Sequence, residues 1–152
     1  FYPNVLRVKH PEATYVKGDG GTFEVDPEPS QVKFFDRTRG RTFIHPGSVN
    51  FSVGKFASGW MVYTQMTATT KLFIRESSMA PVYALLLFGG PLRVHHEAGL
   101  LTVDDWAEFK APASVGVLVK ELRSELSTVL ADKIRHPALE MSENQAVKAI
   151  MQ

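Results

Sequence analysis

The chain has 152 residues, of which 44% are hydrophobic, and this is the size of one compact domain with a continuous core. Its formal net charge is only +1 at pH 7, so bulk charge does not indicate a nucleic-acid-binding protein, and any affinity for anions must come from local clusters. The lack of cysteine excludes disulfides and thiol nucleophiles, and no apolar run approaches the roughly 20 residues of a membrane span, so we expect a soluble cytoplasmic or nuclear protein.

Residues 1–30 contain one clear strand and one loop-rich insertion. Apolar and basic residues alternate over 4–10, which predicts a half-buried strand with Arg7 and Lys9 on its other face. Residues 11–30 combine the glycine-rich cluster at 18–21 with the acidic, proline-rich run DPEPS, so we expect an insertion that is mobile or carries a hairpin. The chain begins at Phe1, directly before the strand, as a piece of a longer protein would.

The middle of the sequence predicts several short strands and one short helix. The predicted strands cover 32–35, 41–45 with an extension at 49–51 beyond a proline-glycine kink, 60–67 and 72–76. Residues 81–88 form an apolar run that fits a strand or a buried helix. We favour a helix, because Pro81 suits a first turn and Gly89-Gly90 suits a stop.

The last part of the chain changes from strand to helix periodicity. A hairpin is predicted at 92–96 and 100–103, and 106–110 closes the β portion, so residues 1–111 predict a small barrel with an insertion at about 11–30. Apolar residues then recur at spacings of three and four over 112–135, which predicts a long helix packed on the barrel. A second helix is expected from Ser142, so that residues 112–152 form a helical extension.

Basic and aromatic residues are interleaved between positions 32 and 76. The basic residues are Lys33, Arg37, Arg39, Arg41, Lys55, Lys71 and Arg75, and the rings are Phe34, Phe35, Phe43, Phe51, Phe56, Trp60, Tyr63 and Phe73. Single-stranded nucleic acid needs cations for its phosphates and flat rings for its bases. The alternative is that the rings belong to the core and the cations protect sheet edges.

No pattern in the sequence indicates catalysis or a metal site. His95 and His96 are neighbours on a predicted strand and point to opposite faces, so they do not converge on one ion. Asp104 and Asp105 before a tryptophan are typical of a turn. The glycine cluster at 18–21 lacks the lysine of a phosphate loop. We therefore expect no enzymatic activity and no cofactor in this fragment.

Long ordered motifs connect the chain with a known family. The stretches RTFIHPGSVNF and GWMVYTQMTATTKLFIRESSMAPVYALLLFGG, with YPN near the start and VLVKELRSELSTVLADKI in the long helix, resemble the OB-fold region near the C-terminus of DEAH/RHA-type RNA helicases. The segments VKFF and LLLFGG are nearer to the RHA-like branch, which includes the DHX57-like and DHX29-like proteins, than to the splicing enzymes.

The resemblance implies a mainly β fold with α: an OB-fold-like barrel with a short inserted helix and a long C-terminal helix. It implies a parent enzyme that uses ATP and Mg²⁺ in two RecA-like domains to move along RNA, with this module at the RNA channel. The implied partners are single-stranded RNA, the RecA-like, winged-helix and ratchet domains of the same chain, and a helicase-activating protein, with no membrane. The rival function is a docking module for a G-patch-like cofactor or a brace on the RecA-like domains.

The resemblance also implies which residues face RNA. By matching the motif strands and turns, we expect contacts from His45, Ser48, Asn50, Thr69, Thr70, Lys71 and Arg75. Secondary basic or aromatic candidates are Lys33, Arg37, Arg41, Lys55 and Tyr63. For His45 the alternative is a backbone hydrogen bond that orders the proline kink, and for Trp60 and Tyr63 it is burial in the core.

Overall fold

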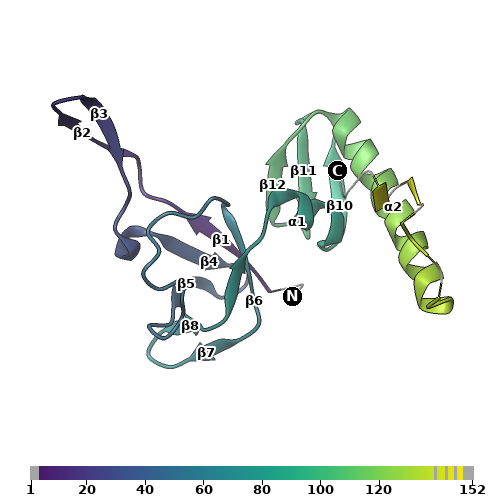
Figure 1. Cartoon of the computed structure of the whole chain (residues 1–152), viewed down its shortest axis with the longest axis horizontal. Helices are drawn as coiled ribbons and strands as arrows, with labels where there is room; N and C mark the ends of the chain where they lie inside the picture. The colour runs from purple at the N-terminus through teal and green to yellow at the C-terminus, as the bar shows by residue number, and fades with distance from the viewer. Residues whose placement is uncertain (1–3, 139, 143, 146, 149–152) are drawn as a thin grey trace. The chain divides into compact units, whose positions relative to one another are not determined.

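The computed structural model describes residues 4–138, 140–142, 144–145 and 147–148. The chain forms two compact units, which divide between Val82 and Tyr83 (Figure 1). The first unit contains most of the strands, and the second contains the long helix. Within the part of the chain that the structure describes, no helix combines the length and the apolar character of a membrane span.

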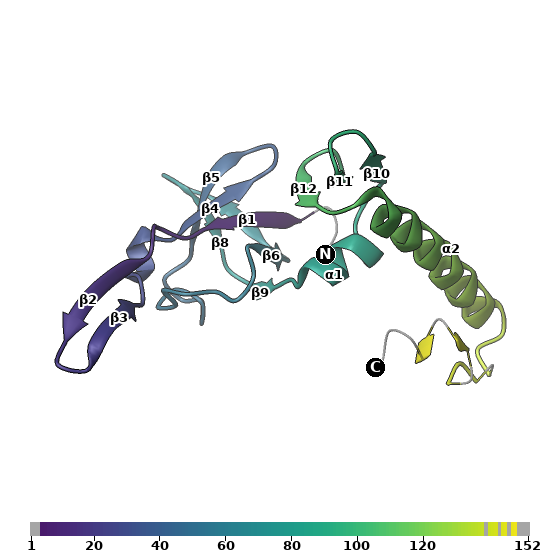
Figure 2. The same cartoon turned by 90° about the horizontal axis from the view of Figure 1, so that it is seen from above.

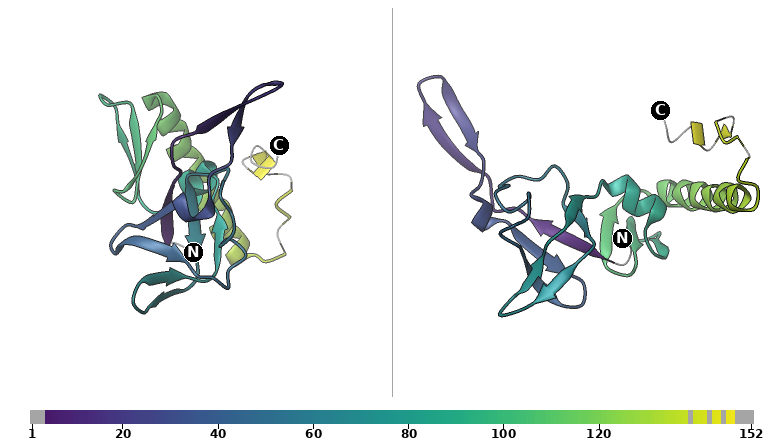
Figure 3. Two further views of the ribbon diagram at one scale, coloured as in Figure 1. Left: turned by 90° about the vertical axis from the view of Figure 1, so that its left-hand side faces the viewer. Right: turned by 60° about the horizontal axis from the view of Figure 1, so that its bottom comes forward.

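A seven-stranded sheet forms the body of the first unit and curls into a half-barrel (Figure 3). Neighbouring strands are antiparallel, except for one parallel pair between the fifth and eighth strands. In spatial order the strands are β7 (Met66–Ala68), β8 (Leu72–Ile74), β5 (Gly40–Ile44), β4 (Lys33–Asp36), β1 (Val5–Lys9), β6 (Trp60–Tyr63) and β9 (Ser77–Met79).

The alternation that predicted the first strand also determines which face of the sheet is buried. Leu6 and Val8 of β1 are 0% and 5% exposed and belong to the core cluster, whereas Arg7 and Lys9 lie on the opposite face. Phe34 of β4 and Ile74 of β8 join the same core cluster. The predicted strands at 4–10, 32–35, 41–45 and 72–76 are therefore confirmed, with small changes at their ends.

Two predicted strands of this sheet differ from the structure, and one further strand was not predicted. Residues 49–51 do not extend the second strand but form turns, in which the Phe51 amide donates to the Ser48 carbonyl at 3.0 Å. The predicted strand 60–67 is interrupted at Thr64 and Gln65, which separate β6 from β7. The Thr64 amide still donates to the Glu76 carbonyl at 3.1 Å, and the Arg75 amide donates to the Gln65 carbonyl at 3.3 Å. Strand β9 was not predicted, because serine-rich residues have weak strand propensity.

The insertion carries a hairpin, which is one of the two alternatives predicted for residues 11–30. Strands β2 (Thr14–Gly18) and β3 (Gly21–Val25) pair with each other, and a single 3-10 turn, η1 (Pro29–Gln31), leads back into the sheet. The hairpin projects away from the seven-stranded sheet of its own unit (Figure 2). It is therefore a distinct arm of the first unit.

The second unit combines a small sheet with two helices. Its elements are α1 (Val82–Phe88), which begins at the boundary, β10 (Leu92–His95), β11 (Leu100–Val103), β12 (Ala107–Lys110) and α2 (Ala113–Arg135). Both predicted helices are confirmed, and α2 contacts β10 and β11. Among the described residues, β10, β11 and β12 pair only with one another. The strand predicted at 106–110 to close the β portion of the barrel, which is β12, therefore belongs to a separate sheet.

Two expectations about the C-terminal part are not decided by these elements. The domain division expected at residue 111 stays a prediction. The helix expected from Ser142 falls on a stretch in which residues 139, 143, 146 and 149–152 lie outside the described residues.

The turn expected at Asp104 and Asp105 is present, and both residues have the positive φ values of 57° and 55° that a tight hairpin turn requires.

Candidate nucleic-acid interface

The outer face of the half-barrel carries alternating cations and aromatic rings. Side chains at odd positions of β1, β4, β5 and β8 share this face, because cross-strand partners point to the same side of a sheet. We call this set the cation–ring ladder, and it consists of Lys9, Phe35, Arg41, Phe43, His45, Lys71 and Phe73. Each member comes from a strand or from the residue that directly adjoins one.

Short distances connect the basic half of the ladder to its rings. The Lys9 Nζ atom lies 5.4 Å from the centre of the Phe35 ring, and the Arg41 Cζ atom lies 5.5 Å from the same centre. Arg41 Cζ is also 5.0 Å from the Phe43 ring, and Lys71 Nζ is 4.6 Å from it. These distances are within the range of cation–π attraction, so Phe35 and Phe43 each have positive charges over the ring.

The ladder continues from Phe43 to His45 through ring contacts. The ring centres of Phe43 and Phe73 are 6.2 Å apart and tilted by 50°, and those of His45 and Phe73 are 5.9 Å apart in an edge-on arrangement. Phe35, Phe43 and Phe73 are all half-buried. Their positions are fixed by the sheet, and part of each ring remains open to solvent.

Arg41 at the centre of the ladder has unsatisfied hydrogen-bonding capacity. Its Nη1 atom is buried and has no hydrogen-bond partner among the described residues. Burial removes water from the guanidinium and lowers the pKa of Arg41 from its usual value. A buried donor without an acceptor is costly, and an anionic ligand would relieve it.

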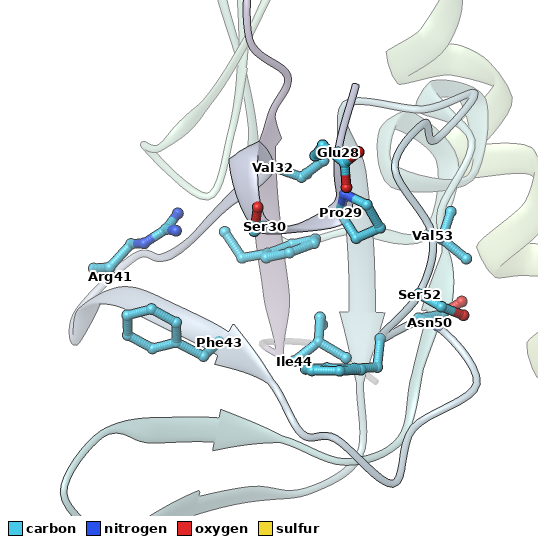
Figure 4. Close-up of a pocket in the computed structure, with 12 residues that line it drawn as sticks. Glu28, Pro29, Ser30, Val32, Arg41, Phe43, Ile44, Asn50, Ser52 and Val53 are labelled. Atoms are coloured by element: carbon cyan, nitrogen blue, oxygen red, sulfur yellow. The ribbon is translucent and has the colours of Figure 1, made fainter. Parts of the chain in front are cut away.

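Arg41 and Phe43 also form one end of a cavity of about 550 Å³ (Figure 4). Figure 4 shows them opposite Asn50, Ser52 and Val53, which lie on the segment between β5 and β6. Pro29 of η1 lies on a third side. The cavity therefore opens beside the centre of the ladder, within the first unit.

Three of the residues expected to face RNA share the outer face. His45 and Lys71 are members of the ladder, and Arg75 follows Phe73 at the next odd position of the same chain segment. Arg75 is exposed and lines a second groove of about 460 Å³ together with Ser48 and Thr64. The structure therefore brings the predicted histidine and both predicted cations to one side of the sheet.

His45 also makes the backbone hydrogen bond that was weighed as its alternative role. Its Nδ1 atom accepts a hydrogen bond of 3.0 Å from the Gly47 amide, beside Pro46. Its own amide donates to the Ile74 carbonyl at 2.8 Å, which joins β5 to β8. The side chain thus orders the turn and contacts Phe73 at the same time.

The polar candidates are partly engaged in local structure. The Asn50 side-chain amide donates to the carbonyl of Ser77 at 2.7 Å and to its hydroxyl at 3.1 Å, so it holds the turn against β9. Thr69 donates its backbone amide to the Lys71 carbonyl at 2.9 Å. Thr69 and Thr70 are exposed in the turn between β7 and β8, next to the ladder.

Of the secondary candidates, Tyr63 is buried, and Lys55 is exposed but paired with carboxylates of the insertion. Tyr63 is 6% exposed and lies in the core cluster, so its ring is not accessible to a base. Trp60 is 7% exposed and is equally unavailable. Lys55 pairs with Glu24 at 2.9 Å and with Asp26 at 3.5 Å, so its charge is balanced by the insertion. Lys33 and Arg37 are exposed, and Lys33 lies across from Lys9.

The sequence placed the three phenylalanines of the ladder among the candidate stacking rings, but it did not assign Lys9 to the site. Lys9 was placed correctly on the outer face of its strand, but it is distant in sequence from the basic cluster at 33–75. The pattern that could have identified Lys9 is the alternation of each strand, which puts Lys9, Phe35 and Arg41 on the side away from the buried residues. Among the described residues, no group of metal-binding side chains accompanies the ladder.

Comparison with known families identifies the class of protein. The family model described as oligonucleotide/oligosaccharide-binding (OB)-fold matches residues 1–92, and the model described as C-terminal domain in RNA helicases matches residues 99–152. Because the first match covers more than half of the chain, the chain belongs to the OB-fold family found in the C-terminal region of DEAH-box RNA helicases.

Individual relatives are DEAH-box helicases of the expected branch. The putative ATP-dependent RNA helicase DHX57 of Homo sapiens is 40% identical over 145 residues, which cover 92% of this chain and 10% of that protein. The ATP-dependent RNA helicase dhx29 of Xenopus laevis is 33% identical over 129 residues, covering 85% and 9%. The ATP-dependent DNA/RNA helicase DHX36 of Homo sapiens is 34% identical over 108 residues, covering 70% and 11%. The chain spans about a tenth of the length of these curated relatives.

Proposed function

We propose that this chain is the RNA-binding OB-fold module of an ATP-dependent RNA helicase and holds single-stranded RNA beside the motor domains. In this proposal the RecA-like, winged-helix and ratchet domains lie elsewhere in the parent protein, which acts in the cytoplasm or nucleus. ATP and Mg²⁺ act in the motor, and the module itself performs no chemistry. The observation that carries the proposal is the cation–ring ladder.

The energies of the ladder favour exchange with RNA. An exposed cation–π contact contributes about 0.5–1 kcal/mol, whereas stacking of a base on an aromatic side chain contributes roughly 1–3 kcal/mol. Lys9 and Lys71 are therefore able to turn toward phosphates while bases take their places on Phe35 and Phe43. Within the described part of the chain, no carboxylate forms an ion pair with Lys9, Arg41 or Lys71.

The first test separates phosphate contacts from other contacts by their salt dependence. Fluorescence anisotropy with a short labelled oligouridine measures the affinity of the chain over a series of salt concentrations. Substitution of Lys71→Gln is expected to weaken binding and to reduce the slope of log affinity against log salt by about 0.7, the value for one phosphate contact on a single strand. The matched control is Lys55→Gln, because Lys55 is already paired with Glu24 and Asp26.

The second test addresses stacking. Phe43→Leu keeps an apolar side chain at the centre of the ladder but removes the ring face. We expect it to weaken binding by roughly 1–3 kcal/mol without changing the salt slope. We therefore expect Lys71→Gln to change the slope of log affinity against log salt, and Phe43→Leu to change only its intercept. A surface that does not bind RNA would not give both results.

The same measurements distinguish RNA binding from the rival function. Docking of a G-patch-like cofactor, or bracing of the RecA-like domains, predicts no oligouridine binding even at low salt. It also predicts that charge reversal by Lys71→Glu leaves the anisotropy of the labelled RNA unchanged. Either result would contradict the RNA-binding proposal.

A further inference from the structure

The β2–β3 hairpin has one apolar face that nothing in the described chain covers. The register pairs Thr14 with Val25 and Val16 with Phe23, so these four side chains share one face. Val16, Phe23 and Val25 are 53%, 58% and 45% exposed. A two-stranded hairpin is marginally stable by itself, and a cluster of exposed apolar residues on it indicates a site of interaction.

The hairpin is held in place at its base. Lys55 bridges the Glu24 and Asp26 carboxylates at the end of β3. Next to Lys55, Gly54 approaches the Pro27 carbonyl so closely that a Cβ atom at position 54 would collide with it. These contacts anchor the hairpin to the first unit, so its apolar face is presented in a defined position.

The charge of the hairpin determines which kind of partner fits. Residues 11–30 contain one basic residue, Lys17, and the acidic residues Glu12, Asp19, Glu24, Asp26 and Glu28, of which Glu24 and Asp26 are paired with Lys55. This charge repels phosphates and attracts lysine and arginine side chains. An RNA strand is therefore disfavoured, and a basic polypeptide is favoured.

The backbone of the hairpin offers a second means of recognition. In the described residues β2 pairs only with β3, and β3 only with β2, so each strand keeps one unpaired edge. An extended peptide can add to such an edge through main-chain hydrogen bonds while alternate side chains contact one face. Added this way, apolar side chains lie on Val16 and Phe23, and basic side chains lie near the carboxylates.

We propose that the β2–β3 hairpin is a docking arm for an extended, basic and apolar segment of a partner protein. The segment adds to a free edge of the hairpin, covers the apolar face and pairs with the surrounding carboxylates. This surface is distinct from the cation–ring ladder, and the proposal does not depend on RNA binding.

A peptide of alternating valine and lysine residues is the probe that tests the proposal. In amide NMR spectra of the chain, we expect the peptide to shift signals of residues 12–28 and to leave the ladder residues unchanged. A peptide with glutamate in place of lysine, and one with glycine in place of valine, are expected to bind at least about tenfold more weakly. Shifts confined to the ladder face, or no shifts at the highest soluble peptide concentration, would overturn the proposal.

Variants on the two faces of the hairpin give matched controls. Phe23→Ser is expected to weaken peptide binding by about tenfold or more, whereas Tyr15→Ser, on the opposite face, is expected to leave it near the original value. If Phe23→Ser disturbs the hairpin itself, the paired change Glu12→Gln and Asp19→Asn tests the charge contribution without touching the apolar face. Unchanged affinity in all of these variants would contradict the proposal.

Competition with RNA distinguishes this proposal from the RNA-binding function. The Phe23→Ser variant is expected to bind labelled oligouridine with unchanged affinity and salt slope. Oligouridine is expected not to displace the peptide. Displacement of the peptide by RNA, with shifts at the hairpin amides, would mean that the hairpin belongs to the RNA surface and would refute the docking arm while leaving RNA binding intact.

Discussion

The hydroxyl of Tyr63 donates a hydrogen bond of 3.0 Å to the buried carboxylate of Asp36. Asp36 also accepts hydrogen bonds from the amides of Thr38 and Arg39 and from the Thr38 hydroxyl. Burial alone would raise the pKa of Asp36, but these hydrogen bonds outweigh it and hold the pKa below its usual value of 3.8. Burial and the Asp36 hydrogen bond raise the pKa of Tyr63 to about 12.

The first prediction is that Tyr63→Phe destabilises the first unit. The substitution keeps the ring in the core but removes a hydrogen bond to a charged group, a loss of about 1.5–3 kcal/mol at neutral pH. Urea denaturation of the variant and the original chain measures the difference. A difference near zero would mean that Asp36 is satisfied fully by the turn that follows β4.

The difference in stability should depend on pH with a definite sign. A tyrosine whose pKa is raised on folding stabilises fully below the unfolded value of 10.0, and this contribution is lost as pH rises toward about 12. A carboxyl group whose pKa is lowered stabilises above about pH 3.8, and this contribution is lost as pH falls further. The cost of Tyr63→Phe should therefore be constant between these limits and shrink outside them.

The second prediction concerns Asn50, whose amide connects a turn to β9. Asn50→Asp replaces a donor by a carboxylate facing the Ser77 carbonyl, so we expect a loss of more than about 1 kcal/mol and a larger effect than Asn50→Ala. Thermal unfolding measures the stability, and oligouridine anisotropy measures RNA affinity on the same variants. Equal stability of the Asp and Ala variants, with reduced RNA affinity in both, would instead assign Asn50 a direct role in binding.

The third prediction concerns Arg123, which connects α2 to the end of α1. Its guanidinium donates to the carbonyls of Leu86, Gly89 and Gly90 at 3.1, 2.7 and 2.7 Å. Arg123→Met keeps the apolar stem but leaves these carbonyls without donors, and should cost about 1–3 kcal/mol. Amide hydrogen exchange is the direct readout. In Arg123→Met the amides of α1 should exchange faster than in the original chain, and the seven-stranded sheet serves as the reference.

Arg123→Lys is the matched control for this helix cap. A lysine ammonium keeps the charge but does not reproduce the planar fork that reaches several carbonyls at once. We expect exchange rates in α1 between those of the original chain and of Arg123→Met. Exchange in Arg123→Lys as slow as in the original chain would show that charge, and not geometry, stabilises the end of α1.

The fourth prediction is that Gly116→Ala destabilises the second unit, although alanine favours helices by up to about 1 kcal/mol. A Cβ atom at position 116 would lie 2.6 Å from Leu101 Cδ2 and 2.8 Å from Val94 Cγ2. We expect a net loss of about 1–3 kcal/mol from overpacking. Ser127→Ala, at an exposed position of the same helix, should be neutral or slightly stabilising in the same thermal melts.

The periodic part of the fold could be read from the sequence because it depends on neighbouring residues. Alternation over 4–10 separates buried Leu6 and Val8 from outward Arg7 and Lys9. Spacings of three and four identify α2, and the glycine pair after Phe88 ends α1 where predicted. The motifs also identified the OB-fold helicase family, because a long ordered motif is a local property of the chain.

The candidate site was only partly predictable, because its contacts join distant segments. Lys9 and Phe35 meet on adjacent strands, and Arg41 reaches both Phe35 and Phe43 across the sheet. Tyr63 is a residue type that often stacks on bases, but here it lies in the core and donates to Asp36, 27 positions away. Lys55 is a residue type that often contacts phosphates, but here it pairs with the Glu24 and Asp26 carboxylates of the insertion.

By itself, the sequence determined the helices, most strands and the inward and outward faces of those strands, because these follow from neighbouring residues. It also determined the family, because long ordered motifs can be recognised without the fold. Only the tertiary structure decided the parallel pairing of β5 with β8, the division of residues 60–67 into two strands and the membership of the cation–ring ladder. Strand order and cross-strand contacts depend on loop closure and core packing over the whole unit, and no local pattern encodes them.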